Sequence, residues 1–171
     1  IPFILEPGEI KLNIYKDSLS SSKVSGTKSN DDFKRYKNET LVYTNELSKI
    51  DEEINVALSS SDSLLVSDLE SQFVNIREKL TDYEFDFINQ NNDSYISSLI
   101  LRRMIFERSI DYNLADSLLN NFSDLVKRTS SSIEIKKIID NYKLTNSESP
   151  RIGSFAPKFS GPGLNGEIIS L

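Results

Sequence analysis

Apolar and polar residues alternate along most of this chain with the period of an α-helix. Between Asp31 and Leu144 there is no glycine and no proline, the two residues that most disfavour a helix interior. In the first part of this stretch, apolar positions recur at alternating spacings of three and four, with one polar member: Phe33, Tyr36, Thr40, Tyr43, Leu47, Ile50, Ile54 and Ala57. The spacing predicts one long amphipathic helix from Asp31 to Leu58.

A second apolar stripe follows the polar linker Ser59–Ser63. Its members are Leu65, Leu69, Phe73, Ile76, Leu80, Tyr83 and Phe87. They predict a second helix from Leu65 to about Phe87, with Asp62 or Ser63 as its N-cap. Two helices joined by so short a loop are expected to pack antiparallel. The N-cap oxygens of the first helix are expected from the segment Ser29–Asp32.

The rest of the helical stretch divides into shorter segments at polar runs. The pattern predicts a third helix over Ser94–Ser109, a fourth over Leu114–Arg128 and a fifth over Ile133–Leu144. Their spacing resembles that of stacked helical repeats, but no residue-level repeat is found. The predicted fold class is therefore mostly α: a long antiparallel helical hairpin plus about three shorter helices.

The N-terminal segment has the pattern of β-structure. An apolar run, Pro2–Leu5, precedes a Pro7-Gly8 turn, and Lys23–Gly26 is a weak last strand. Between them three apolar residues alternate with polar ones, which predicts a half-buried strand: Ile10, Leu12 and Ile14. A lone hairpin is marginal in water, so we expect a partial β element whose other strands lie upstream of Ile1, or whose strands lie on the helices.

Composition removes most enzyme chemistries. The 20 basic and 26 acidic residues give a net charge of −6, which argues against a nucleic-acid partner. Because Cys and His are absent, the chain has no thiol nucleophile, disulfide, thiolate metal site or imidazole base. No apolar run is long enough to span a membrane. We assign no catalytic, cofactor-binding or metal-ligating residue.

Three charged clusters have two interpretations each. The acidic groups Asp51–Glu53 and Asp82, Glu84 and Asp86 suggest an acid–base pair or a cation site, but a solvated helix face is the favoured interpretation. The basic group Arg102, Arg103 and Arg108 suggests either an anion site or pairing with the acidic helices. Pairing is the favoured interpretation.

The C-terminal segment carries the most specific motif. Gly153-Ser154-Phe155-Ala156-Pro157-Lys158-Phe159 is followed by Asn165-Gly166-Glu167-Ile168-Ile169-Ser170-Leu171. Asn-Gly is a favoured tight-turn dipeptide, which predicts a hairpin with Phe159 packed inward and a strand beginning at Ile168. The motif resembles the start of TlpA/ResA-like thiol–disulfide oxidoreductases, a branch of the thioredoxin-like superfamily related to the AhpC/TSA family. The resemblance implies paired cysteines beyond Leu171, so no catalytic residue transfers to this chain.

A second resemblance lies at the other end. Phe3–Ile10 and Val24–Asp31 look like the end of an uncharacterised β-rich module that precedes such redox domains in envelope proteins of Gram-negative bacteria. The implied organisation is the end of that module (1–29), a helical domain (30–145), a linker (146–152) and the start of a truncated thioredoxin-like domain (153–171). The start at Ile1, without a leader, is interpreted as an internal fragment or a processed product.

The resemblances imply a function for this region in redox homeostasis at the periplasm or cell envelope. It would be the non-catalytic part of the oxidoreductase, and would position the redox domain, dimerise or select client proteins. The expected partners are therefore proteins, either a client or a second copy. The alternative is a stand-alone helical binding or scaffold protein with no redox role.

Overall fold

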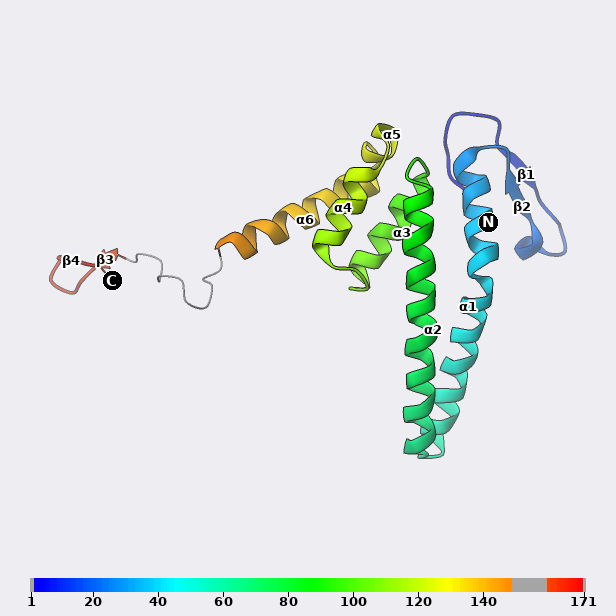
Figure 1. Ribbon diagram of the computed structural model, residues 1–171, viewed down its shortest axis with the longest axis horizontal. Helices are drawn as coiled ribbons and strands as arrows, with labels where there is room; N and C mark the ends of the chain where they lie inside the picture. The colour runs from blue at the N-terminus through cyan, green and yellow to red at the C-terminus, as the bar shows by residue number, and fades with distance from the viewer. Residues whose placement is uncertain (1, 149–159, 171) are drawn as a thin grey trace.

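The computed structural model describes residues 2–148 and 160–170 (Figure 1). The N-terminal elements are β1 (Lys11–Asn13), the 3₁₀-helix η1 (Leu19–Ser21) and β2 (Lys23–Ser25). The helices are α1 (Lys28–Ser59), α2 (Ser63–Gln90), α3 (Tyr95–Phe106), α4 (Tyr112–Asn121), α5 (Asp124–Lys127) and α6 (Ser130–Glu148). Strands β3 (Ser160–Pro162) and β4 (Ile168–Ser170) follow. Helices dominate, and the predicted mostly-α class is confirmed.

The helical hairpin is formed by α1 and α2, which lie side by side and run antiparallel (Figure 1). The two predicted stripes meet along its seam: buried Ile50, Ala57, Leu69 and Ile76 pack with partly buried Tyr43, Leu47, Ile54, Val66 and Phe73. Asp62 is the N-cap of α2, and its Oδ1 accepts a hydrogen bond from Leu65 N at 3.1 Å. The predicted hairpin, its seam and its second cap are confirmed.

A second core joins the C-terminal end of α2 to α3, α4, α5 and α6. Its buried members include Phe87, Ile88, Ile96, Leu101, Met104, Leu118, Phe122, Ile135 and Ile139. The predicted single helix over Leu114–Arg128 is wrong, because α4 ends at Asn121. Phe122 is extended and buried, and Ser123 starts α5 by accepting a hydrogen bond from Val126 N at 3.4 Å. A buried aromatic residue and a new N-cap thus break the helix.

The last helix is longer than its pattern predicts. It begins at Ser130, where Thr129 Oγ1 accepts a hydrogen bond from Ser132 N at 3.4 Å, and it continues to Glu148, into the predicted linker 146–152. Polar residues that look like linkers in the sequence therefore extend α6 at both ends. They are tolerated because exposed helix positions do not require apolar side chains.

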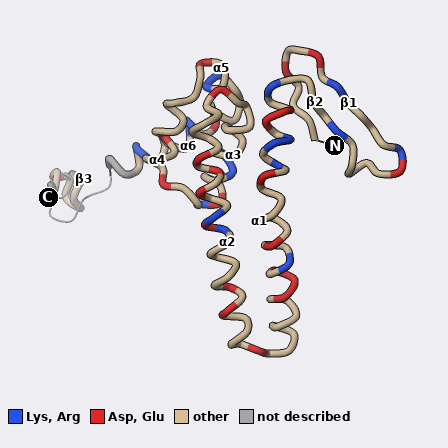
Figure 2. The backbone as a smooth tube through the Cα atoms, turned by 45° about the vertical axis from the view of Figure 1, so that its right-hand side comes forward, with Lys and Arg blue, Asp and Glu red and all other residues tan. Residues whose placement is uncertain are grey.

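The N-terminal strands differ from the prediction in two respects. β1 pairs antiparallel with β2, with Leu12 opposite Val24, so its partner follows in the chain. β2 lies between β1 and α1 (Figures 1 and 2), and Val24 is buried. Leu12 on β1 is 45% exposed and Ile14, just after the strand, is 63% exposed, so the prediction of a half-buried strand is wrong. Among the described elements β2, rather than β1, provides the main strand contact with α1. Pairing of β1 with another chain stays a prediction.

The C-terminal pair β3–β4 is an antiparallel hairpin, as predicted, with Gly161 opposite Ile169. Gly166 N donates to Gly163 O at 3.0 Å, and Gly166 has φ +79°. The turn therefore runs from Gly163 to Gly166, and Gly166 is its left-handed last residue. A turn that ends in a left-handed glycine is a frequent form of the three-residue hairpin loop. Phe159 and Leu171 lie outside the described residues, and so do the other motif residues before Ser160. Whether this segment packs on the helices or pairs with a neighbour stays a prediction.

Candidate functional site

The candidate functional site is an apolar groove where the segment 3–7 meets the beginnings of α3 and α6 and the short helix α5. We call it the N-terminal groove; its volume is about 710 Å³. Its apolar lining consists of Phe3, Ile4, Leu5, Pro7, Tyr95, Leu99, Leu125 and Val126, and its polar lining of Glu6, Ser29, Asp93, Thr129 and Ser130. Leu5 and Leu125 are 86% and 80% exposed. Large apolar side chains gathered around a concave surface are characteristic of binding sites.

Asn30, in the first turn of α1, holds one wall of the groove in place. Its Nδ2 donates to Ile4 O at 2.8 Å, and its Oδ1 accepts from Ile4 N at 2.9 Å. The same Nδ2 donates to Thr27 Oγ1 at 2.7 Å. Asn30 is buried, so these hydrogen bonds are shielded from water and fix the backbone of Ile4 firmly. The adjacent side chains of Phe3 and Leu5 line the groove.

Glu6 caps the first helix from outside it. α1 begins at Lys28 and its N-cap residue Thr27 makes no side-chain capping bond, so the predicted cap within Ser29–Asp32 is wrong. Instead the Glu6 carboxylate accepts hydrogen bonds from Ser29 N at 2.8 Å and Ser29 Oγ at 2.7 Å. Burial by itself raises the pKa of Glu6, but hydrogen bonds from Ser29, Thr27 and the backbone outweigh burial and lower it. A carboxylate also suits the positive end of the helix dipole.

Ion pairs fix α1 to the turn between α2 and α3. Lys28 Nζ lies 3.2 Å from Asp32 and 3.3 Å from Asp93, which lines the groove. Burial acts to lower the pKa of Lys28, but these two carboxylates raise it overall. Arg35 donates to Asn91 Oδ1 at 2.5 Å. These contacts connect the start of α1 with the α2–α3 turn, which contributes Asp93 to the groove.

The acidic group on α2 does not behave as one cluster. Asp82 and Asp86 are exposed, as predicted, but the Glu84 side chain is only 3% exposed, so its assignment to a solvated face is wrong. Glu84 lies one helical turn from both Leu80 and Ile88, which are buried. That position places it on the packed face of α2. The three residues are not brought together as an acid–base site.

The predicted pairing of the arginines holds for two of the three. Arg103 forms an ion pair with Glu84, and Arg102 Nε lies 2.5 Å from Glu134 of α6. Arg108, at the turn after α3 with φ +56°, makes no ion pair within the described residues. These pairs connect α2, α3 and α6 and leave no shared anion site.

The remaining acidic group, Asp51–Glu53, is exposed on the lower part of the hairpin, and Glu53 pairs with Lys49 at 3.4 Å (Figure 2). Among residues 2–148 and 160–170, no cluster of three or more acidic side chains has the arrangement of a metal site. None of the helices described there combines the length and hydrophobicity that a membrane span requires.

Sequence reasoning missed the N-terminal groove. Its lining comes from separate parts of the chain: the segment 3–7, α1, the α2–α3 turn, α3, α5, and the start of α6 with the residue before it. The one available signal was the apolar run Pro2–Leu5, which lies outside both small sheets. Comparison with known proteins finds no matching protein family, no matching curated protein and no matching solved structure.

Proposed function

We propose that this chain is the non-catalytic region of a bacterial envelope thiol–disulfide oxidoreductase, and that it selects the client protein through the N-terminal groove. The observation that carries the proposal is the exposure of Leu5 and Leu125 on two walls of that groove. The resemblance of Gly153–Leu171 to the start of a thioredoxin-like domain supports the redox connection. A client site on the helical region would hold the client near the redox domain that follows it.

The lining of the groove defines the chemistry of its occupant. Within the described residues, the backbone groups of Phe3 and Leu5 make no hydrogen bond, whereas those of Ile4 are both bound by Asn30. An extended client segment can pair with these unused groups and place alternate apolar side chains in the groove. The charged lining residues are Glu6 and Asp93, without a lysine or arginine. Both carboxylates already have partners in the chain, Glu6 with Ser29 and Asp93 with Lys28, so the apolar lining determines the occupant. The occupant is therefore an extended apolar segment.

The helical region has its own core and does not depend on a redox domain for burial. Leu101, Ile135 and Ile139 have no exposed surface, and they come from α3 and α6. A region with a separate core can orient a following domain without sharing its interior. Positioning of the redox domain is thus compatible with client selection by the same region.

The test uses the chain extended through the expected cysteine pair. We compare the double variant Leu5→Glu/Leu125→Glu with the parent in reduction of insulin and of a small disulfide, glutathione disulfide. The variant is expected to raise the KM for insulin about tenfold or more, because two charges enter the apolar groove. Reduction of the small disulfide should not change. The matched control is Leu64→Glu, since Leu64 is equally exposed but lies at the start of α2, away from the groove.

The outcomes separate the two parts of the proposal. An extended chain without a cysteine pair contradicts the redox connection and favours the stand-alone scaffold. Equal KM values for the parent and the double variant contradict client binding in the groove, whatever the activity toward glutathione disulfide.

A further inference from the structure

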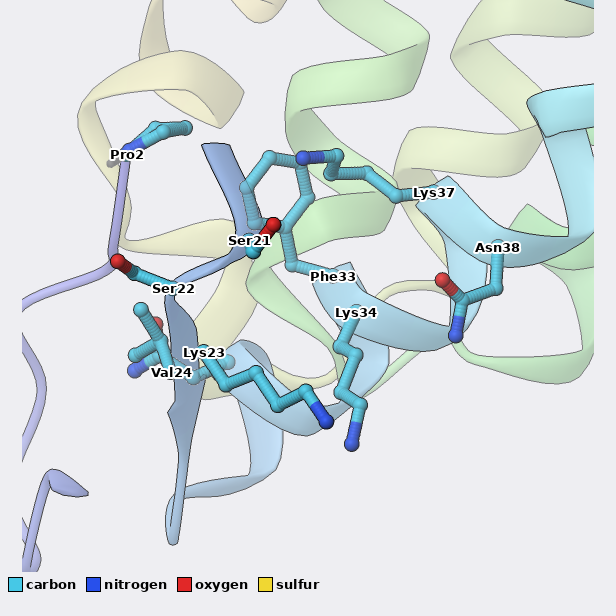
Figure 3. Close-up of a pocket in the computed structure, with 10 residues that line it drawn as sticks. Pro2, Ser21, Ser22, Lys23, Val24, Phe33, Lys34, Lys37 and Asn38 are labelled. Carbon is cyan, nitrogen blue, oxygen red and sulfur yellow. The ribbon is translucent and has the colours of Figure 1, made fainter. Parts of the chain in front are cut away.

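A second pocket, between β2 and the first turns of α1, collects basic side chains (Figure 3). Its volume is about 350 Å³. Lys23 comes from β2, whereas Lys34 and Lys37 come from α1, one helical turn apart on the same face. Because β2 packs along α1, a lysine of the strand and two of the helix line one hollow.

The three lysines have no carboxylate partner. None of them forms an ion pair within the described residues, and no aspartate or glutamate lines the pocket. Asp31 and Glu39 line an adjoining hollow with Lys34. Figure 3 shows the side chains of Lys23 and Lys34 pointing to one side of the pocket, whereas Lys37 reaches over the Phe33 ring on the other side. In a chain of net charge −6, these lysines without a carboxylate partner form a local positive field. An anion bound among them would relieve their mutual repulsion.

The rest of the pocket suits a small ligand. Its floor contains Phe33 and the buried Val24, and Lys37 Nζ lies 5.8 Å from the centre of the Phe33 ring. Ser22 Oγ accepts a hydrogen bond from Tyr15 N at 3.0 Å, which leaves its hydroxyl proton to donate to a ligand. The side chain of Asn38 also lines the pocket and is labelled in Figure 3. The volume is near the lower end of the range for small-molecule sites, roughly 300–1,000 Å³.

We propose that this pocket binds a small molecule that carries two phosphate or sulfate groups. One phosphate would lie on the side of Lys23 and Lys34 and the other on the side of Lys37, so the lysines together match the charge of about −3 expected for a diphosphate near neutral pH. The neutral donors provide further hydrogen bonds. The site is separate from the N-terminal groove and shares no lining residue with it. It does not depend on the proposed redox connection.

The test is calorimetric titration of the chain with inorganic pyrophosphate at low ionic strength. Lys34→Gln and Lys37→Gln are each expected to weaken binding about tenfold, the usual effect of one charge-assisted hydrogen bond. The matched control is Lys79→Gln, an exposed lysine on α2 that lines neither pocket. Added salt should weaken binding of the parent more than that of the lysine variants.

Three results would overturn the proposal: no heat of binding with pyrophosphate, an equal loss in Lys79→Gln, or no salt dependence. A parallel arm adds vesicles of phosphatidylglycerol to the chain in place of pyrophosphate. Binding to vesicles without binding to pyrophosphate would also overturn it, because the recognised group would then be a lipid surface. A nuclear magnetic resonance titration locates the ligand. Pyrophosphate that changes the chemical shifts of Phe33 and Asn38 supports binding in this pocket.

Discussion

The Glu84–Arg103 ion pair offers a direct test of how the helical core is held together. Glu84 on α2 is almost completely buried, and it accepts a hydrogen bond from Tyr36 of α1 while it pairs with Arg103 of α3. Three helices therefore meet at one carboxylate. Burial raises the pKa of Tyr36, and the charge of Glu84 raises it further, so the phenol stays a donor. Burial acts to lower the pKa of Arg103, but Glu84 raises it overall.

Removing one partner of the pair is expected to lower the free energy of unfolding far more than removing both. Arg103→Leu leaves the Glu84 carboxylate buried without its cation, and loss of one partner of a buried pair costs about 3–5 kcal/mol. Because Arg103 itself is 34% exposed, water replaces part of the lost interaction, so we expect a value near 3 kcal/mol. For a chain of this length that corresponds to a decrease in Tm of roughly 6–12 °C. The double variant Glu84→Leu/Arg103→Leu should regain most of this loss, since it leaves no buried charge.

The measurement is urea unfolding of the parent, both single variants and the double variant, followed by circular dichroism and analysed as a double-mutant cycle. The matched control is Arg102→Leu, because Arg102 pairs with Glu134 at the surface of the same helix. A loss below about 1 kcal/mol for Arg103→Leu, or a double variant less stable than either single variant, would refute the reasoning.

Three further predictions concern stability. Leu101→Ala should cost about 2–5 kcal/mol because Leu101 has no exposed surface, whereas Leu47→Ala, at a half-buried seam position, should cost about 1–2 kcal/mol in urea unfolding. Because the pKa of Glu6 is lowered in the folded chain, its contribution is present above the ordinary value of 4.5 and is lost as pH falls through the lower folded value. Stability measured against pH should therefore fall less in Glu6→Gln than in the exposed control Glu9→Gln; equal slopes would contradict the cap. Gly26→Ala should lower the free energy of unfolding by about 1–3 kcal/mol, since Gly26 has φ +100° and a Cβ there would lie 2.4 Å from Glu9 O. The measurement is thermal unfolding, and an unchanged Tm would show that this turn can shift.

The long helices were predictable from the sequence because their information is local and repeated. Each apolar residue of the seam, such as Leu47 or Phe73, lies on a stripe of several members, so one exception like Thr40 does not change the period. Asp62 was predictable as a cap because a cap acts on the next few residues. The C-terminal hairpin was predictable for the same reason, since its turn residues are contiguous with both strands.

Other features depended on residues distant in the chain. The cap of α1 comes from Glu6, which lies more than twenty positions before Ser29, and no local pattern specifies that contact. Glu84 is part of an acidic run in the sequence, and only its position against Tyr36 and Arg103 makes it a buried charge. The break between α4 and α5 follows from the burial of Phe122 in a core that other helices supply.

Composition and periodicity were enough to predict the helical class, the hairpin and the lack of thiol and imidazole groups, because they do not depend on which surfaces meet. Both candidate binding sites, in contrast, exist only in the folded chain. The N-terminal groove needs Leu5 and Leu125 on neighbouring walls, and the basic pocket needs Lys23 beside Lys34. Side chains from separate elements come together only when the chain packs, and that packing is set by the sum of many weak contacts rather than by any short motif.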